Sequence, residues 1–327
     1  MGDVLALMRR SVVWDNHACL PLRPDDVAFL PQLQRHKAAG ASVVSVNVCS
    51  DTDVAGHPFE MLAAFRKWLG ARPEEYVLVS TVADIERARR EDKLAIVFDV
   101  EGGLSVQDDP ERIADLYALG VRWLLLAYNR NNRLGGGCQD EDDGLTAQGR
   151  RALDVMKRVG MVYCGSHTGA RTVREAMEYL DQPVIFSHSN PRAVHDHPRN
   201  IGDDLIRACA ATGGVVNVSG IGLFLGDNDD RTETYVRHVR HVADLVGHRH
   251  VGIGLDYVFD REELDAMVRA NPDVWPPELG YAAGIRMVEP ERIPRIADAL
   301  LAAGWSDAAL EGFLGGNNLR VARAVWK

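Results

Sequence analysis

Hydrophobic positions along the chain gather into short apolar runs, separated by longer segments in which apolar residues recur with a helical period. The apolar runs are rich in valine, isoleucine and leucine and are bounded by polar residues or glycine, which is typical of buried strands. They lie at residues 11–16, 41–48, 93–100, 121–127, 161–163, 183–186, 214–219 and 251–255. Each run therefore predicts one strand.

The segments between these runs predict helices. They lie at residues 25–39, 59–69, 82–91, 110–119, 146–159, 171–180, 203–211 and 233–246, and the chain from residue 261 onward is also mostly helical in pattern. Thr146 is expected to cap its helix, and Gly160 to end it. About eight strands alternating with helices predict a single (β/α)₈ barrel over residues 1–327. A doubly wound open sheet is the alternative, although no glycine-rich phosphate loop follows the first strand.

Two of the apolar runs lead into the same Ser-His pair. Ser166-His167 and Ser187-His188 stand on either side of one predicted helix, so the segment reads as a strand–helix–strand unit with a histidine after each strand. The C-terminal ends of the strands of a parallel barrel open at one common mouth. The two imidazoles are therefore candidates to share a metal ion.

Further polar side chains stand at the ends of other predicted strands, namely His17, Glu101, Tyr128 and Asp256. Imidazole and carboxylate ligands suit Zn²⁺, and Glu101 could bridge two ions held by different histidines. A buried carboxylate without a partner is costly, so a metal or another cation is expected beside it. Two such ions would activate a water and polarise a carbonyl, which indicates metal-assisted hydrolysis of an amide or a related bond.

Composition and charge limit the classes of partner that the chain is expected to bind. The formal charge of −10 makes a nucleic-acid partner unexpected, because phosphate backbones need basic patches. The sequence contains no apolar run long enough for a transmembrane span and no secretory signal pattern, so no membrane partner is expected. Five cysteines without framework spacing indicate reduced thiols and a cytoplasmic location.

Several motifs together resemble the membrane (renal) dipeptidase family of zinc hydrolases, within the amidohydrolase-like barrels. They are FDVEGG around Glu101, GSH at 165–167, VGIGLD at 251–256, GGNNLR at 315–320 and, as the most specific match, PVIFSHSNPRAVHDHPRN at 183–200. The resemblance covers nearly the whole chain. It implies a barrel with its metal site at the C-terminal strand ends, and it makes a homodimer plausible.

The resemblance also implies a role for each matching residue. His17 corresponds to a ligand of one metal site, Glu101 to the bridging carboxylate, and His167 and His188 to the ligands of the second site. Arg199 resembles the arginine that holds the free carboxylate of the substrate, for which a forked guanidinium is suited. Asp256 resembles the acid/base aspartate, which also meets the substrate's amino group.

Two positions depart from the family pattern. Cys19 stands where the family's first-strand His-x-Asp motif has its aspartate; it is either a thiolate ligand or a small buried thiol. Tyr128 stands where the family has a substrate-facing histidine. Its hydroxyl is a candidate donor to a developing oxyanion, and Tyr128 and the adjacent Asn129 are predicted to bind substrate.

The sequence thus predicts a zinc-dependent hydrolase of the dipeptidase type with one or two Zn²⁺ ions per chain, in which a metal-activated water cleaves a dipeptide or a similar small substrate. The departures at Cys19 and Tyr128 leave two alternatives open. One is an enzyme acting on another small amide, such as an N-acyl amino acid or a lactam. The other is a barrel that has drifted to a metal-binding or ligand-binding role.

Other polar residues receive weaker interpretations. Asp99, two positions before Glu101, is a possible neighbour of the metal ligands, because alternate strand residues share a face. His57 could line the mouth of the barrel. Two further histidines, His195 and His197, are read as loop residues. Four others are expected to face solvent or to satisfy helix carbonyls, namely His238, His241, His248 and His250.

Overall fold

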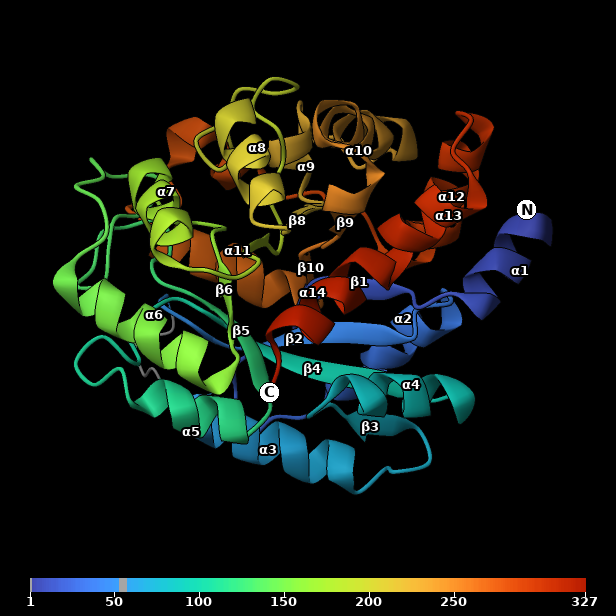
Figure 1. Cartoon of the computed structure of the whole chain (residues 1–327), viewed down its shortest axis with the longest axis horizontal. Helices are drawn as coiled ribbons and strands as arrows, with labels where there is room; N and C mark the ends of the chain where they lie inside the picture. Colours follow the sequence, from blue (N-terminus) through green and yellow to red (C-terminus); the bar gives the residue numbers. More distant parts are fainter. Residues whose placement is uncertain (1, 53–57) are drawn as a thin grey trace.

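The computed structural model describes residues 2–52 and 58–327, and its centre is a closed barrel of parallel strands (Figure 1). The barrel strands are, in spatial order, β1 (Trp14–Cys19), β2 (Val43–Ser50), β4 (Leu94–Glu101), β5 (Val121–Leu125), β6 (Val162–Cys164), β7 (Ile185–Phe186), β8 (Val215–Val218) and β9 (Val251–Ile253). Pairing of Asp15 on β1 with Ile253 on β9 closes the ring. The predicted eight-stranded (β/α)₈ barrel is confirmed, and the open-sheet alternative is wrong.

Two short strands extend this sheet without belonging to the ring. β3 (Tyr76–Leu78) pairs with the first half of β4, and β10 (Tyr257–Val258) pairs with the end of β1, where Val258 lies opposite Cys19. The apolar pattern predicted neither strand, because runs of two or three residues carry no measurable period.

Helices surround the barrel, and most lie between consecutive strands. They are α1 (Gly2–Arg10), α2 (Gln34–Ala38), α3 (Pro58–Gly70), α4 (Val82–Arg90), α5 (Arg112–Ala118), α6 (Ala147–Val159), α7 (Ala170–Tyr179), α8 (Asp203–Ala211), α9 (Gly222–Leu225), α10 (Thr232–Val246), α11 (Arg261–Ala270), α12 (Ile293–Ala302), α13 (Asp307–Glu311) and α14 (Asn317–Val325). Within the described ranges, no helix has both the length and the apolar content that a bilayer crossing needs.

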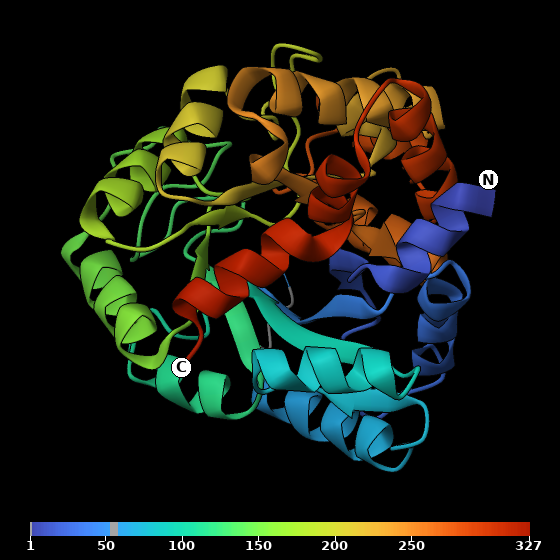
Figure 2. The same ribbon diagram turned by 45° about the vertical axis from the view of Figure 1, so that its right-hand side comes forward.

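Helix α14 covers one end of the barrel, as Figure 2 shows. Its Leu319 and Ala322 pack in one cluster with Trp14, the first residue of β1, and the ring of Trp326 meets that of Trp14 at 5.9 Å. The N-terminal ends of the strands are therefore buried under this helix. The opposite end, where the strands finish, remains available for a site.

Two predicted boundaries are wrong. Of the helix predicted at 25–39, only the 3₁₀ turn η1 (Leu30–Leu33) and α2 are helical. Asp26 instead accepts a hydrogen bond from the amide of Ala28 and forms a local turn, as short polar side chains do in competition with a helix. The first strand begins at Trp14 rather than at residue 11. Ser11 directly follows α1, and its hydroxyl donates a hydrogen bond to the carbonyl of Leu7 in that helix.

Candidate metal centre and active site

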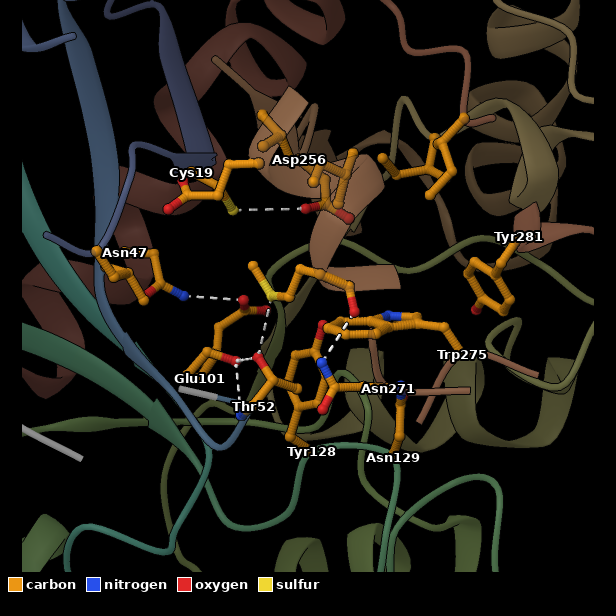
Figure 3. Close-up of a pocket in the computed structure, with 18 of the residues that line it drawn as sticks. Cys19, Asn47, Thr52, Glu101, Tyr128, Asn129, Asp256, Asn271, Trp275 and Tyr281 are labelled. Carbon is orange, nitrogen blue, oxygen red and sulfur yellow. Dashed lines mark hydrogen bonds between the residues drawn. The ribbon is translucent and has the colours of Figure 1, made fainter. Parts of the chain in front are cut away.

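Three imidazoles converge on one oxygen of Glu101. The Nε2 atoms of His17, His167 and His188 lie 3.3, 3.3 and 3.1 Å from Glu101 Oε1. None of these contacts has hydrogen-bond geometry: Glu101 Oε1 and His188 Nε2 are both buried without a hydrogen-bond partner in the described part of the chain. The other carboxylate oxygen, Oε2, accepts from Asn47 at 2.8 Å (Figure 3). The carboxylate is thus held from one side and faced by nitrogen ligands on the other.

Each imidazole uses its second nitrogen to contact a neighbouring acceptor. His17 Nδ1 lies 3.3 Å from Asp99, and His167 Nδ1 lies 2.8 Å from Asn129 Oδ1. His188 Nδ1 lies 2.7 Å from the hydroxyl of the preceding serine. In a neutral ring, a proton held on Nδ1 leaves Nε2 with its lone pair, and this is the arrangement of histidines that bind metal. Burial lowers the pKa of His17, but Cys19, Glu101 and Asp99 outweigh it and raise that pKa well above its usual value, so His17 would have to release a proton to bind an ion. Asp99 is thus a neighbour of a candidate ligand, as its position on the strand suggested.

Three overlapping groups of ligand atoms could each hold an ion, and in each group the ligand atoms lie within 4.8 Å of one another. Two of the groups share Glu101, one with His17 and Cys19 and the other with His167 and His188. The third consists of His17, His188 and Asp256. A buried carboxylate oxygen that faces three imidazole nitrogens without a hydrogen-bond partner would be costly, so the donor set fits a bound cation.

Burial and charge set the protonation of these groups. Burial lowers the pKa of His167 to about 3, and burial likewise holds the pKa of His188 well below its usual value. Both imidazoles are therefore neutral, as metal ligands must be. Burial raises the pKa of Glu101, but His17 and the other two imidazoles outweigh it and hold that pKa well below its usual range. The carboxylate is therefore ionised.

Cys19 reaches the same centre from the end of β1. Its Sγ lies 3.3 Å from His17 Nε2 and 3.9 Å from Asp256 Oδ1. Burial raises the pKa of the Cys19 thiol to about 12, so the side chain is a neutral thiol while no cation lies beside it. A bound metal ion would be needed to deprotonate it.

Three residues at the rim of the centre have left-handed backbones. Asn129, His167 and Asp256 have φ angles of 58°, 62° and 60°. Such angles are uncommon outside glycine and cluster at functional sites, where the surrounding structure enforces them. They turn side chains at the strand ends toward the mouth of the barrel.

A cavity of about 550 Å³ opens above the metal centre. Among the predicted site residues it is lined by Cys19, Glu101, Tyr128, Asn129, His167, Arg199 and Asp256, whereas His17 and His188 are fully buried beneath it. The structure thus brings together every predicted site residue. Their assigned roles stay predictions.

Arg199 is a buried cation, and no carboxylate among the residues that the structure describes forms an ion pair with it. Its side chain is 2% exposed, and its Nε and Nη2 atoms have no hydrogen-bond partner among residues 2–52 and 58–327. The guanidinium lies 5.1 Å from the centre of the Phe224 ring. A buried donor left in this way is expected to meet an anionic group of a ligand.

Asp256 and Tyr128 border the cavity at different points. Asp256 Oδ1 lies 3.6 Å from His17 Nε2, and burial raises the pKa of Asp256 to about 7. The rings of Tyr128 and His167 stack with their centres 3.9 Å apart. Burial raises the pKa of Tyr128 well above the usual value, so its hydroxyl keeps its proton. Asn129 lines the cavity and contacts both His167 and the carbonyl of Val274, and its predicted contact with substrate stays a prediction.

Two residues near Arg199 were missed by the sequence interpretation. The hydroxyl of Tyr281 is buried in the cavity wall without a hydrogen-bond partner in the described chain, and Figure 3 shows the ring at the edge of the pocket. His197, read as a loop histidine, is buried, and its Nδ1 accepts a hydrogen bond from the backbone amide of Arg199 at 3.1 Å. No signal in the sequence marks Tyr281, because it follows no strand.

The remaining histidines do not line the cavity, and His57 lies outside the described residues. His238 is buried within α10, where its Nε2 donates to Leu225. Of the two alternatives predicted for His238, exposure to solvent is wrong, because the helix turns this side chain toward the core. The other agrees with the structure, since the acceptor is the carbonyl of the last residue of α9.

Comparisons with known proteins agree with this geometry. Residues 4–266 match the sequence model of the membrane dipeptidase family, peptidase family M19. An uncharacterized protein from the pqqA 5′ region of Klebsiella pneumoniae is 31% identical over 84% of this chain and 99% of its own length. Dipeptidase verJ of Clonostachys rogersoniana is 31% identical over 76% of this chain and 60% of its own, greater length. The crystal structure of an amidohydrolase from Pseudomonas aeruginosa, 24% identical, covers 99% of both chains with a TM-score of 0.87 and shows the fold.

Proposed function

The chain belongs to the membrane dipeptidase family, peptidase family M19, and from this premise we propose that it is a zinc-dependent dipeptidase. It would cleave the amide bond of a dipeptide, or of a similar small substrate with a free carboxylate. The observation that carries the proposal is the convergence of three imidazole Nε2 atoms on Glu101 Oε1 at the floor of the cavity.

We propose one or two Zn²⁺ ions per chain. His167, His188 and Glu101 would hold one ion, and His17, Cys19 and Glu101 the other, with Glu101 as the bridge. Nitrogen, oxygen and thiolate ligands in such small sets suit zinc better than calcium or magnesium. When bound, these ions supply Lewis-acid polarisation of a carbonyl and a water that deprotonates near neutral pH.

The residues of the chain would then orient the substrate and move its protons. Arg199 would bind the substrate's carboxylate through its unpaired Nε and Nη2 atoms and so set the register of the scissile bond. Asp256 would accept a proton at Oδ1 from the attacking water and return it to the leaving amine. The hydroxyl of Tyr128 would donate a hydrogen bond to the oxygen of the carbonyl under attack, since Tyr128 lines the cavity beside His167.

Replacement of a ligand tests the proposal most directly. His188→Ala should lose bound metal and dipeptide hydrolysis together, because it removes a fully buried nitrogen from one ligand set. Elemental analysis gives metal atoms per chain, and a panel of L,L and L,D dipeptides gives the rate. His248→Ala, outside the cavity, is the control. A His188→Ala variant that hydrolysed dipeptides at the parental rate would show that the assignment is wrong.

A different small amide is the second candidate substrate, favoured by the neutral Tyr128 hydroxyl where the family has a histidine. The same panel extended to N-acyl amino acids and lactams separates it from the first. A protein that is fully loaded with metal and binds these compounds without cleaving any would favour the drifted, non-catalytic barrel.

We also propose a cytoplasmic location and a homodimer. All five cysteines are free thiols, which supports a reducing compartment. The homodimer rests on the family resemblance alone. Light scattering of the purified chain tests it, and a monomer at micromolar concentration would contradict it.

A further inference from the structure

One wall of the cavity is apolar beside Cys19 and Asp256. Five side chains form this apolar wall, which is defined by Leu20, Leu22, Val258, Leu264 and Met267. Leu20 and Leu264 are buried, and the other three are half-buried, so the wall presents hydrocarbon to whatever fills the cavity. Nothing in the proposed chemistry requires an apolar surface at this place.

Strand pairing fixes the position of the wall. Val258 lies opposite Cys19 in the pairing of β10 with β1, and Leu20 directly follows Cys19. Leu264 and Met267 come from α11, the helix that follows β10. The wall therefore stands next to the His17–Cys19 group and to Asp256, which would meet the substrate's amino group.

The carboxylate end of the substrate would lie elsewhere in the cavity. Arg199 and Tyr281 both pack around Phe224, at 5.1 and 6.3 Å from its ring centre. In Figure 3, Tyr281 lies on one side of the pocket, while Cys19 and Asp256 lie together on the other. A dipeptide anchored by its carboxylate at Arg199 would thus direct the side chain of its N-terminal residue toward the apolar wall.

The charged residues beside the wall are already paired. Arg23 lies 2.8 Å from Glu263 and 3.1 Å from Asp260, and the same arginine also contacts Asp26. A charged side chain of a substrate would lose hydration against the wall and would have to displace one of these ion pairs. An apolar side chain would gain from the same burial.

Taking the proposed dipeptidase activity as given, we infer that the apolar wall binds the side chain of the substrate's N-terminal residue and selects large apolar side chains there. The cavity of about 550 Å³ has the size of sites that enclose drug-sized ligands. Because each methylene placed in an apolar pocket changes specificity by tenfold or more, leucine or phenylalanine should outrank glycine by at least about tenfold.

A dipeptide panel on the metal-loaded full chain tests this selection. The panel contains leucyl-, phenylalanyl-, glycyl-, glutamyl- and lysyl-alanine, with the alanine in whichever configuration is cleaved, and the reversed peptide alanyl-leucine. We expect kcat/KM for the leucyl and phenylalanyl substrates to exceed the other three alanine peptides by about tenfold or more. Equal rates for the lysyl or glutamyl substrate, or an advantage that follows the C-terminal residue, would overturn the inference.

Two variants assign the selection to the wall. Val258→Thr keeps the shape of a half-buried side chain but adds a hydroxyl, and Leu264→Asn makes a buried position polar. In each, the ratio of kcat/KM for leucyl-alanine over glycyl-alanine should fall by about fivefold or more. Val159→Thr, a half-buried valine at the end of α6, is the matched control and should leave the ratio unchanged. A ratio that stays at the parental value in both wall variants would contradict the inference.

Failure of the proposed dipeptidase activity can be distinguished from failure of the apolar-wall inference. If the metal-loaded protein cleaved none of the dipeptides, the dipeptidase proposal would fall, and calorimetry would measure their binding instead. Tighter binding of leucyl-alanine than of glycyl-alanine by about tenfold would still support the apolar wall. Equal affinities would overturn it independently of the reaction.

Discussion

At the scale of single residues, the metal centre depends on what the second nitrogen of each histidine contacts. The Nδ1 atom of each histidine contacts a neighbouring side chain: Asp99 for His17, Asn129 for His167 and Ser187 for His188. The three Nε2 atoms therefore face Glu101 and can face a cation. The partners of His17 and His167 lie far away along the chain, so the barrel sets the orientation of these two rings. The partner of His188 is the preceding serine, which is a local contact.

Tyr281 allows a sharp test at this scale. Tyr281→Phe removes only a hydroxyl that is buried in the cavity wall without a partner in the described chain. If this hydroxyl donates to the substrate's carboxylate beside Arg199, its loss should raise KM for dipeptides about tenfold, since hydrogen bonds to charged groups contribute about 1.5–3 kcal/mol. Steady-state kinetics measures the change. Tyr179→Phe, at an exposed tyrosine on α7, is the control, and an unchanged KM in Tyr281→Phe would rule out the contact.

At the scale of secondary-structure elements, α10 buries an ionisable group, His238, on the same face as Tyr235 and Val242. Burial, together with the nearby Arg237, His195 and His241, lowers the pKa of His238 to about 4. The donation of Nε2 to Leu225 opposes the shift but does not cancel it. The imidazole is therefore neutral in the folded protein and protonates readily only when the chain unfolds.

This buried histidine makes stability depend on pH. Because the pKa of His238 is about 4 when folded and about 6.5 when unfolded, protons favour the unfolded chain, and stability is lost as pH falls from 6.5 toward 4. Between pH 7.5 and 5 this one group should cost on the order of 2 kcal/mol. Urea unfolding of His238→Gln at the two pH values should show a smaller difference than the parent. His248→Gln should behave like the parent, and equal pH differences in all three proteins would refute the claim.

At the scale of the whole molecule, the metal centre joins strands from opposite parts of the ring. His17 and Cys19 lie on β1 and Glu101 ends β4, whereas His167 and His188 follow β6 and β7. Ions bound among them would cross-link segments that are far apart along the chain. Helix α14 covers the other end, so one end of the barrel holds packed core and the opposite end holds the candidate site (Figure 2).

Removal of metal should therefore lower global stability. A ligand present at 100 times its Kd contributes about 2.7 kcal/mol, which corresponds to a shift in Tm of about 4 °C for a chain of 327 residues. We expect calorimetry to show such a decrease after dialysis against a chelator, and recovery after addition of Zn²⁺. His188→Ala should respond less than the parent to either treatment. A parent Tm that is indifferent to both would contradict a metal bound within the barrel.

Much of the architecture was determined by the sequence itself. Apolar runs alternating with helical segments predicted the barrel, Thr146 and Gly160 marked the two ends of α6, and the repeated Ser-His pairs marked two strand ends. These features are local, since period, capping and turn preference depend on neighbouring residues. Local signals failed at β3, β10 and the turn before α2, where the elements are too short or side-chain hydrogen bonds compete with the helix.

Only the tertiary structure decided which side chains meet. Closure of the ring through β1 and β9 brings His17 to His188, and it places Cys19 opposite Val258. The same closure sets the cavity wall and puts Tyr281, which follows no strand, beside Arg199. Contacts between residues hundreds of positions apart are fixed by the curvature and register of the whole sheet, and no period or motif within one segment carries that information.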